Sequence, residues 1–219
     1  MQVSNRTYAE LKRIQVWTGA LPVGLFLLSH LATNARVVAG ARAFDRAAEQ
    51  IGRIPHLATI EVIAIALPMV VHVILGIVLA TTAQGAEDQR GYARPRMLLA
   101  QRASGFFLVI YVAFHVWGTR LAPDRHAGGR DLFALMADRL SHPGWLAFHA
   151  AGVIAAAFHF GNGMVALAGP WGLNAGERPR AVVERLGLAA FVLLSLVGLQ
   201  ALLAFVVPDL RWLEPRPAP

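Results

Sequence analysis

Five long runs of apolar residues, separated by segments that carry arginine, limit this chain to one class of fold. The runs cover residues of about 14–36, 57–83, 98–120, 144–170 and 184–207. Each is long enough to cross the hydrocarbon core of a bilayer, which needs about 20 helical residues. With 56% hydrophobic and 15% charged residues, the composition is that of a membrane protein. The sequence therefore predicts an all-α bundle of five transmembrane helices, forming a single domain over residues 1–219.

The absence of cysteine and the net charge of +7 exclude several kinds of site. Without thiolates there is no disulfide, no cysteine-ligated metal and no covalent attachment of haem. The positive charge is mostly arginine in the connections, which is typical of contact with membrane lipid and not of nucleic-acid binding. Ten of the 20 Lys and Arg residues fall on each side of the membrane, so the positive-inside rule gives a tie. Shorter connections on the side of the N-terminus favour a cytoplasmic N-terminus.

Four of the eight histidines lie in the interiors of four different predicted helices. They are His30, His72, His115 and His159, at intervals of 42, 43 and 44 residues. A single buried histidine is explained equally well by a hydrogen bond to a neighbouring helix. Four together favour a functional role, because polar groups at this depth are costly and usually functional.

Estimated depth separates the four histidines into two pairs. At ~1.5 Å per helical residue, His30 and His115 stand roughly 22–24 Å above the inner boundary, and His72 and His159 roughly 15 Å. Two imidazoles that face each other at one level can ligate an iron porphyrin on both sides. Zinc would require three or four converging ligands, often with thiolate or carboxylate among them. The sequence therefore predicts two stacked, non-covalently bound b haems inside the bundle.

Small residues follow two of these histidines at helical spacing. Gly76 and Gly163 each lie four residues after a histidine, at His72 and His159, so the same helix face carries no side chain one turn away. We expect these glycines to make room for a flat macrocycle. Close packing of helices on small residues explains each glycine taken singly.

The segments around the four histidines resemble those of a known protein family. The segments are "QVWTGALPVGLFLLSHLATN", "LPMVVHVILG", "LLAQRASGFFLVIYVAFHVWGTR" and "FHFGNG" followed by "WGL". Over nearly the whole chain they resemble the dihaem cytochrome b membrane anchor of succinate:quinone oxidoreductases, of the type with one large membrane subunit. The resemblance implies that His30 and His115 ligate the haem distal from the catalytic subunits, and that His72 and His159 ligate the proximal haem.

The same resemblance implies partners, location and direction of electron flow. The chain would lie in the bacterial cytoplasmic (inner) membrane as a multi-pass subunit, with its N-terminus cytoplasmic and its C-terminus outside. It would dock a succinate-oxidising flavoprotein and an iron–sulfur subunit, and would pass electrons from the proximal to the distal haem and on to a quinone near the outer face. Related fumarate reductases carry a carboxylate on the fourth helix, where this chain has Ala157 in "AAAFHF". This difference favours succinate oxidation with menaquinone as acceptor.

Polar residues near the helix ends are candidates for the haem propionates, which require cationic or hydrogen-bonding partners at the water boundary. The candidates are Gln15 and Arg102 at the inner edge and Arg36 and Arg120 at the outer edge. Interfacial anchoring explains each arginine equally well.

Glu61 and His149 are the candidates for delivering protons to quinone. Glu61 precedes His72 by 11 residues, which in a regular helix returns it to the same face. Its estimated height of roughly 31 Å matches the roughly 30 Å of His149, above the distal haem. The alternative is an interfacial glutamate paired with a loop arginine.

Two other functions remain open from the sequence. One is the quinol-oxidising anchor of a fumarate reductase, which shares the cofactors. The other is a haem-free membrane transporter that uses its buried histidines as a proton relay. Pro22 and Pro68 are expected to kink the first two helices.

Overall fold

The computed structural model describes residues 4–82, 95–122, 131–169 and 176–214. Within these residues all the regular elements are helical, and five spans are long and apolar enough to cross a membrane. The predicted all-α bundle is confirmed. The first span joins α1 (Asn5–Thr18), a π-helical turn (Gly19–Val23), α2 (Gly24–Asn34) and a 3₁₀ turn (Ala35–Ala39). The second joins α4 (Leu57–Ile60), a π-helical turn (Glu61–Ala66) and α5 (Leu67–Thr81), and the others are α7 (Pro95–Gly118), α9 (Pro143–Ala168) and α10 (Glu177–Ala204).

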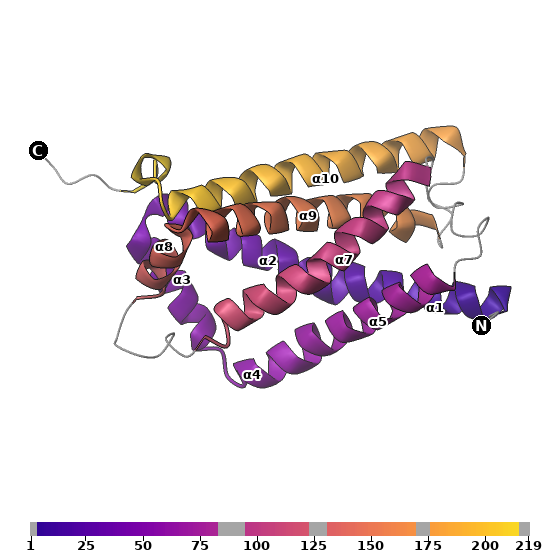
Figure 1. Cartoon of the computed structure of the whole chain (residues 1–219), viewed down its shortest axis with the longest axis horizontal. Helices are drawn as coiled ribbons and strands as arrows, with labels where there is room; N and C mark the ends of the chain where they lie inside the picture. The colour runs from indigo at the N-terminus through magenta and orange to yellow at the C-terminus, as the bar shows by residue number, and fades with distance from the viewer. Residues whose placement is uncertain (1–3, 83–94, 123–130, 170–175, 215–219) are drawn as a thin grey trace, which may run out of the picture.

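The five spans lie along one axis, so the bundle has two distinct ends (Figure 1). The N-terminus and the start of α1 lie at one end, called here the N-terminal end. Two shorter helices, α3 (Ala41–Gly52) and α8 (Leu132–Leu140), lie at the other, called here the capped end. In Figure 1, α9 and α10 run side by side, and α7 crosses in front of them toward α4 and α5.

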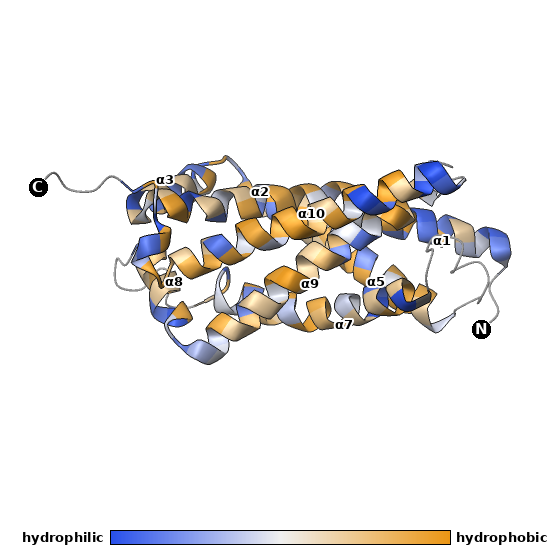
Figure 2. Ribbon diagram, turned by 90° about the horizontal axis from the view of Figure 1, so that it is seen from above, coloured by the Kyte–Doolittle hydropathy of each residue, from blue (hydrophilic) through white to orange (hydrophobic). Residues whose placement is uncertain are grey.

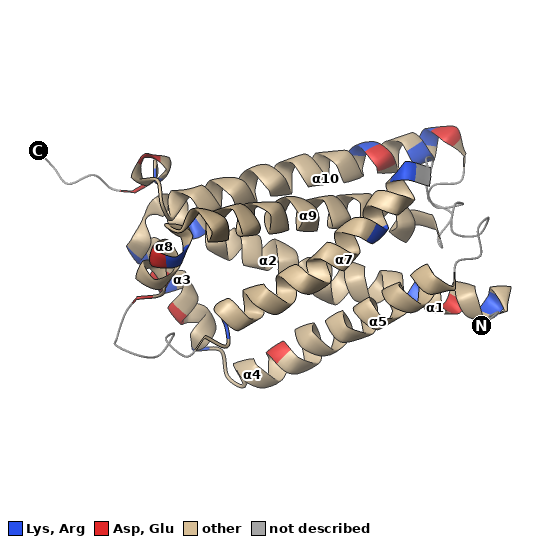
Figure 3. Cartoon of the chain, in the orientation of Figure 1, with Lys and Arg blue, Asp and Glu red and all other residues tan. Residues whose placement is uncertain are grey.

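Polarity follows the same axis. Hydrophobic residues dominate the middle of the long helices, and hydrophilic ones gather toward the two ends (Figure 2). Charged side chains are concentrated at the same two ends (Figure 3). Large apolar side chains point outward along the spans, with Leu99, Trp117 and Leu196 each more than 60% exposed. A surface of this kind is stable only against lipid, so the protein is a multi-pass membrane protein.

Two spans begin earlier than their apolar runs. The first helix begins at Asn5 and not near residue 14, because Ser4 caps it by accepting the Thr7 N–H at 3.2 Å. The fifth begins at Glu177 and not near 184, and its first turns carry an Arg180–Glu184 ion pair one turn apart. Apolar patterning locates the part of a helix in lipid, whereas capping sets where the helix starts. The ends predicted at residues 83 and 170 lie outside the described residues.

The capped end holds a compact apolar cluster that the sequence did not predict. Its buried members come from the first span, α3, α8 and the end of α10: Val37, Val38, Phe44, Leu140, Ala201, Leu202, Ala204 and Phe205. Asp45 on α3 accepts the Phe133 N–H at 2.8 Å and so supplies the N-terminal cap of α8 from another helix. Burial raises the pKa of the Asp45 carboxyl, against the lowering effect of this hydrogen bond.

Helices α9 and α10 approach closely through glycine. A Cβ added at Gly161 would collide with the Gly187 carbonyl oxygen, and one added at Gly187 would meet the Gly161 carbonyl oxygen. Such contacts between small residues let helix backbones pack directly in a membrane. They fix α9, which carries His159, against the fifth span.

Both predicted kinks coincide with π-helical turns. Pro22 lies inside the turn Gly19–Val23, and Pro68 is the second residue of α5, which begins directly after the turn Glu61–Ala66. A π turn takes up one extra residue and often occurs at functional sites. The residues before each turn are therefore rotated relative to a regular α-helix.

Candidate functional site

The structure brings the four buried histidines together in two pairs. The rings of His30 (α2) and His115 (α7) lie 5.8 Å apart between centroids and are nearly perpendicular, at 86°. The rings of His72 (α5) and His159 (α9) lie 6.2 Å apart at 85°. These are the two pairs expected from depth, and each joins two different spans.

The spacing within each pair suits a metal held between two imidazoles. An imidazole nitrogen binds a transition metal at about 2.0 Å, so two rings on opposite sides of one ion have centroids about 6 Å apart. Across the described residues, no three His, Cys, Asp or Glu side chains converge as a zinc site would require. An iron porphyrin would need only two imidazole ligands from the protein, and each pair could supply them.

The rings of the His72–His159 pair, called here the proximal pair, are oriented by hydrogen bonds from neighbouring helices. The Nδ1–H of His72 donates to the backbone carbonyl of Gln15 on α1 at 2.7 Å. On the other side, Nδ1 of His159 lies 3.1 Å from the Ser104 hydroxyl oxygen on α7. Hydrogen bonds at Nδ1 leave Nε2 available as the ligand nitrogen, which is the usual second-shell arrangement around metal-binding histidines.

Two glycines make room for these rings. A Cβ on Gly19 would collide with the His72 ring, and a Cβ on Gly105 would lie 3.0 Å from Cε1 of His159. At Gly76 and Gly163, a Cβ would make ordinary contacts of 3.7 and 3.6 Å with the amide nitrogens of Gln15 and Gln101. Gly19 and Gly105 are thus the glycines in closest contact with the ligands. The expectation that Gly76 and Gly163 accommodate a macrocycle stays a prediction.

The same arrangement occurs twice. Gln15 on α1 and Gly19 in the adjoining π-helical turn contact His72 on α5, and Gln101 and Gly105 on α7 contact His159 on α9, with the same four-residue spacing. This repeat is hard to see in the sequence, because Gly19 precedes His30 by 11 residues whereas Gly105 precedes His115 by 10. The π-helical turn Gly19–Val23 takes up the extra residue.

Sequence reasoning also missed a polar network that ties α7 to α9 beside the proximal pair. The Gln101 amide donates to the His159 carbonyl oxygen at 3.0 Å. Asn162 donates to the Gln101 side-chain oxygen at 2.8 Å and to the Met97 carbonyl oxygen at 3.2 Å. In an apolar bundle such satisfied amides fix helix register, so they hold His159 at a defined height.

The His30–His115 pair, called here the distal pair, has different surroundings. Asn34 Nδ2, one turn along the same helix, lies 3.3 Å from His30 Nε2. The Nδ1 of His115 is buried and has no hydrogen-bond partner among the described residues. A buried polar nitrogen without a partner is costly, which indicates a site completed by a bound group.

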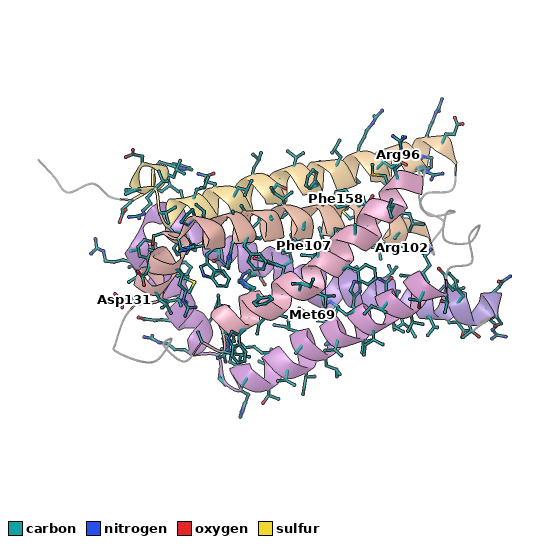
Figure 4. All side chains as sticks on the ribbon, in the orientation of Figure 1. Met69, Arg96, Arg102, Phe107, Asp131 and Phe158 are labelled. Atoms are coloured by element: carbon teal, nitrogen blue, oxygen red, sulfur yellow. The ribbon has the colours of Figure 1, made fainter. Side chains whose placement is uncertain are left out.

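Aromatic rings surround the distal pair. On α7, Phe107, Tyr111 and His115 stack at successive helical turns, with centroid separations of 6.3 and 5.5 Å. Figure 4 labels Phe107 in the interior of the bundle, with Arg102 nearer the N-terminal end of the same helix. The ring of His149 on α9 lies 5.6 Å from that of His115 and 5.8 Å from that of Tyr111. His149 is therefore part of the immediate surroundings of the distal pair.

Glu61 forms an ion pair in the structure. Arg120, just past the end of α7, donates through Nε and Nη2 to the Glu61 carboxylate at 2.9–3.2 Å. The glutamate lies in the π-helical turn Glu61–Ala66, so the 11-residue spacing to His72 does not return it to the same face as regular α geometry would. Roles for Glu61 in quinone protonation and for Arg120 at a propionate stay predictions.

The other candidates for the propionates lie at different places along the bundle. Gln15 and Arg102 are partly buried, on α1 and α7 respectively, whereas Arg36 is exposed in the 3₁₀ turn Ala35–Ala39. The backbone carbonyl of Gln15 also accepts a hydrogen bond from His72, a contact that the sequence did not predict. Their assignment to propionates is not tested by the geometry.

An apolar groove of about 300 Å³ lies at the capped end, where α7 and α9 meet. It is lined by Phe114, His142, Gly144, Trp145 and Phe148. The rings of Trp145 and Phe148 also contact the ring of His149, at 5.9 and 5.8 Å. The groove is therefore connected to the distal pair through the ring of His149, which contacts that of His115.

Comparison with known proteins gives one strong similarity. The chain is 37% identical over 195 residues to the succinate dehydrogenase cytochrome b558 subunit of Bacillus subtilis (strain 168), covering 89% of this chain and 96% of that protein. No model of a protein family matches the chain. No solved structure matches it.

Proposed function

The chain belongs to the family of succinate dehydrogenase cytochrome b subunits, and we propose that it passes electrons from the iron–sulfur subunit of that complex, through two b haems, to a quinone. It is a multi-pass membrane subunit of an oxidoreductase complex. The route of the electrons, the number of haems and the nature of the acceptor are proposals. On this proposal the succinate-oxidising site lies on the flavoprotein and not on this chain.

The observation that carries the proposal is that the four buried histidines form two pairs. The ring centroids lie 5.8 Å apart in the distal pair and 6.2 Å apart in the proximal pair. Each pair joins two spans, so each haem would bind between helices and hold them together. The buried and unpartnered Nδ1 of His115 and the glycines against His72 and His159 support a fit to bulky, ligand-demanding groups. The name of the Bacillus relative, a cytochrome b, agrees with haem b as the group.

The residues of this chain would then position the cofactors and set their properties. When bound, the two haems supply one-electron carriers between the iron–sulfur subunit and the quinone. His72 and His159 would ligate the proximal iron, and His30 and His115 the distal iron. Gln15, Arg102, Arg36 and Arg120 are proposed as donors to the propionates.

We place the quinone at the capped end, in or beside the groove between α7 and α9. The groove is lined by aromatic rings, which suit a flat apolar ring, and its walls contact His149. His149 and Glu61 are the residues proposed to carry protons to the reduced acceptor, and the contact with Arg120 holds the Glu61 carboxyl group in place.

Menaquinone and the succinate-oxidising direction are proposed from Ala157. Its side chain is buried, at 1% exposure, in a cluster with Leu31 and Leu194. A carboxylate at this position would disrupt the apolar packing of α9 against α2 and α10. The site is therefore built without the acid that the related fumarate reductases carry.

We propose that the N-terminal end faces the cytoplasm and the catalytic subunits, and that the C-terminus lies outside. His72 and His159 each lie 9 residues before the ends of α5 and α9 at this side, whereas His30 and His115 lie 25 and 20 residues after the starts of α1 and α7. The proximal pair is therefore the nearer to this end and would receive electrons first. The docking partners are the flavoprotein and the iron–sulfur subunit.

The test is reduction by succinate of the haems in membranes that carry the complete complex. We expect succinate to reduce b-type haem and a menaquinone analogue to reoxidise it. An absence of b-type absorption would favour the haem-free proton relay. Haem that menaquinol reduces and fumarate reoxidises, without succinate oxidation, would favour a fumarate reductase.

A further inference from the structure

Ser104 has no assigned role in the proposed electron route, although its side chain contacts His159, a proposed ligand of the proximal haem. It lies on α7, partly buried, and its hydroxyl oxygen is 3.1 Å from Nδ1 of His159. The same hydroxyl lies 3.0 Å from the carbonyl oxygen of Gln101, which can only accept. The Ser104 hydrogen is therefore directed to Gln101, and its oxygen accepts the Nδ1–H of His159.

We propose that Ser104 is a positioning residue that sets the orientation and the electron-donating strength of His159 toward the proximal haem iron. This inference rests on the proposed function. By accepting the Nδ1–H, Ser104 fixes the tautomer in which Nε2 carries the lone pair for the metal. It also increases the basicity of the ring, as second-shell acceptors do for metal-bound histidines. A more basic ligand favours the oxidised iron and lowers the midpoint potential of the haem.

The other ligand of the same pair shows why a hydroxyl is informative here. His72 is held by a backbone carbonyl, that of Gln15, at 2.7 Å. Both proximal rings thus donate Nδ1–H across a helix interface, one to the backbone and one to a side chain. Only the bond to Ser104 can be removed by substitution, and Gly105 beside it confines the His159 ring from the next position of α7.

Ser104→Ala removes the acceptor and leaves the volume nearly unchanged. Ser104→Thr keeps a hydroxyl that can repeat both contacts. Ser29→Ala is the matched control, since the Ser29 hydroxyl makes the same kind of bond to its own helix, to the Phe26 carbonyl oxygen at 3.0 Å, next to the distal ligand His30. The distal haem serves as an internal reference in every variant.

The experiment is a redox titration of the b-type absorption bands of the purified complex, with electron paramagnetic resonance of the oxidised haems. We expect Ser104→Ala to shift the midpoint potential of the proximal haem upward and to change its resonance signal, with the distal haem unchanged. Ser104→Thr and Ser29→Ala should match the parent. Loss of the proximal haem alone in Ser104→Ala, with retention in Ser104→Thr, would also support the proposal.

Two results would overturn it. One is a Ser104→Ala complex with both haems bound and an unchanged proximal potential and resonance signal. The other is loss of the proximal haem from both Ser104→Ala and Ser104→Thr, because packing and not the hydrogen bond would then hold His159. A parent complex without two b-type components would instead overturn the proposed function, and with it the role of Ser104.

Discussion

The two histidine pairs have similar spacing but are built differently. In the proximal pair both rings donate hydrogen bonds across helix interfaces, to Gln15 and Ser104, and an amide network fixes α9 against α7. In the distal pair the His30 ring has its described hydrogen-bond contact with Asn34 of its own helix, and Nδ1 of His115 is buried without a described partner. Aromatic rings and His149 replace the amides there.

The difference fits the two ends of an electron relay. Rings held by hydrogen bonds keep a fixed orientation and ligand strength, which suits a site that receives electrons from a docked subunit. The distal pair contacts His149, whose ring neighbours Trp145 and Phe148 line the apolar groove, and on the proposed function the quinone would enter and take up protons there. We infer that the proximal site is built for position and the distal site for exchange with the quinone.

The largest effect should come from removing ligands. His72→Ala or His159→Ala should each abolish the proximal haem and keep the distal one, and His30→Ala or His115→Ala should do the reverse. Each variant therefore loses about half of the haem. Difference spectra and redox titrations of purified complexes measure this. If variants of His30 and His72 lose the same component, the pairing is wrong.

Crowding a ring should affect only the proximal site. In Gly105→Val the new side chain would press on His159, whose Cε1 already lies 3.0 Å from the position of a Cβ. Overpacking of this kind costs about 1–3 kcal/mol, so the proximal haem should bind about 10-fold or more weakly. Haem retention during detergent washing provides the measurement.

Gly118→Val is the matched control for that substitution. Gly118 lies on the same helix, and a Cβ there would have no atom within 4 Å. Equal haem loss in the two variants would indicate that valine harms α7 in general and would remove Gly105 from the proximal site.

At the capped end, Glu61→Gln should slow turnover without haem loss. The amide keeps the volume and can still bind Arg120, but it cannot take up a proton. Because general acid–base groups contribute about 10²–10⁴-fold, we expect succinate:quinone activity to fall by at least about 10-fold. Succinate should still reduce the proximal haem in this variant. Unchanged turnover would exclude Glu61 from the mechanism.

The smallest effect concerns the helices that cover the capped end. Asp45→Ala removes the cap of α8, which costs about 1 kcal/mol. Asp45→Asn keeps an oxygen that can accept the Phe133 N–H. Thermal unfolding of the purified complex, monitored together with release of the distal haem, should show the loss for alanine and not for asparagine.

The stability of the capped end should decrease as the pH rises, because of Asp45. Burial raises the pKa of Asp45 in the folded state above that of the unfolded chain, so ionisation of this group disfavours the folded cap. The free-energy cost of ionising Asp45 in the folded state is absent below the pKa of the unfolded chain. It grows as the pH rises through the pKa of the folded state. Asp45→Asn should remove this dependence, and an identical pH profile in parent and variant would contradict it.

The number of spans and the two histidine pairs could be predicted because both follow from simple periodicity. A run of about 20 apolar residues defines a span, and a rise of ~1.5 Å per residue gives the height of each histidine. The π-helical turns at Gly19–Val23 and Glu61–Ala66 could not be predicted in this way. They shift the helix phase, so the repeat of Gln15 and Gly19 in Gln101 and Gly105 was missed, as was the orientation of Glu61.

Contacts between distant segments were equally hidden. Helices α3 and α8 are too short to show a membrane signal, and their packing depends on Asp45 and Phe133, which are 88 residues apart. As a single serine within an apolar run, Ser104 has no distinctive pattern in the sequence. Its hydrogen bond to His159, 55 residues away, required the structure.

The haem content of the purified complex tests the central claim most directly. We expect two b haems per copy of this chain, both low-spin with two histidine ligands, resolved as two components in a redox titration. The measurement combines total haem determination with quantification of the chain and electron paramagnetic resonance of the oxidised sample. One haem per chain, or a high-spin signal from a singly ligated iron in the intact complex, would contradict it.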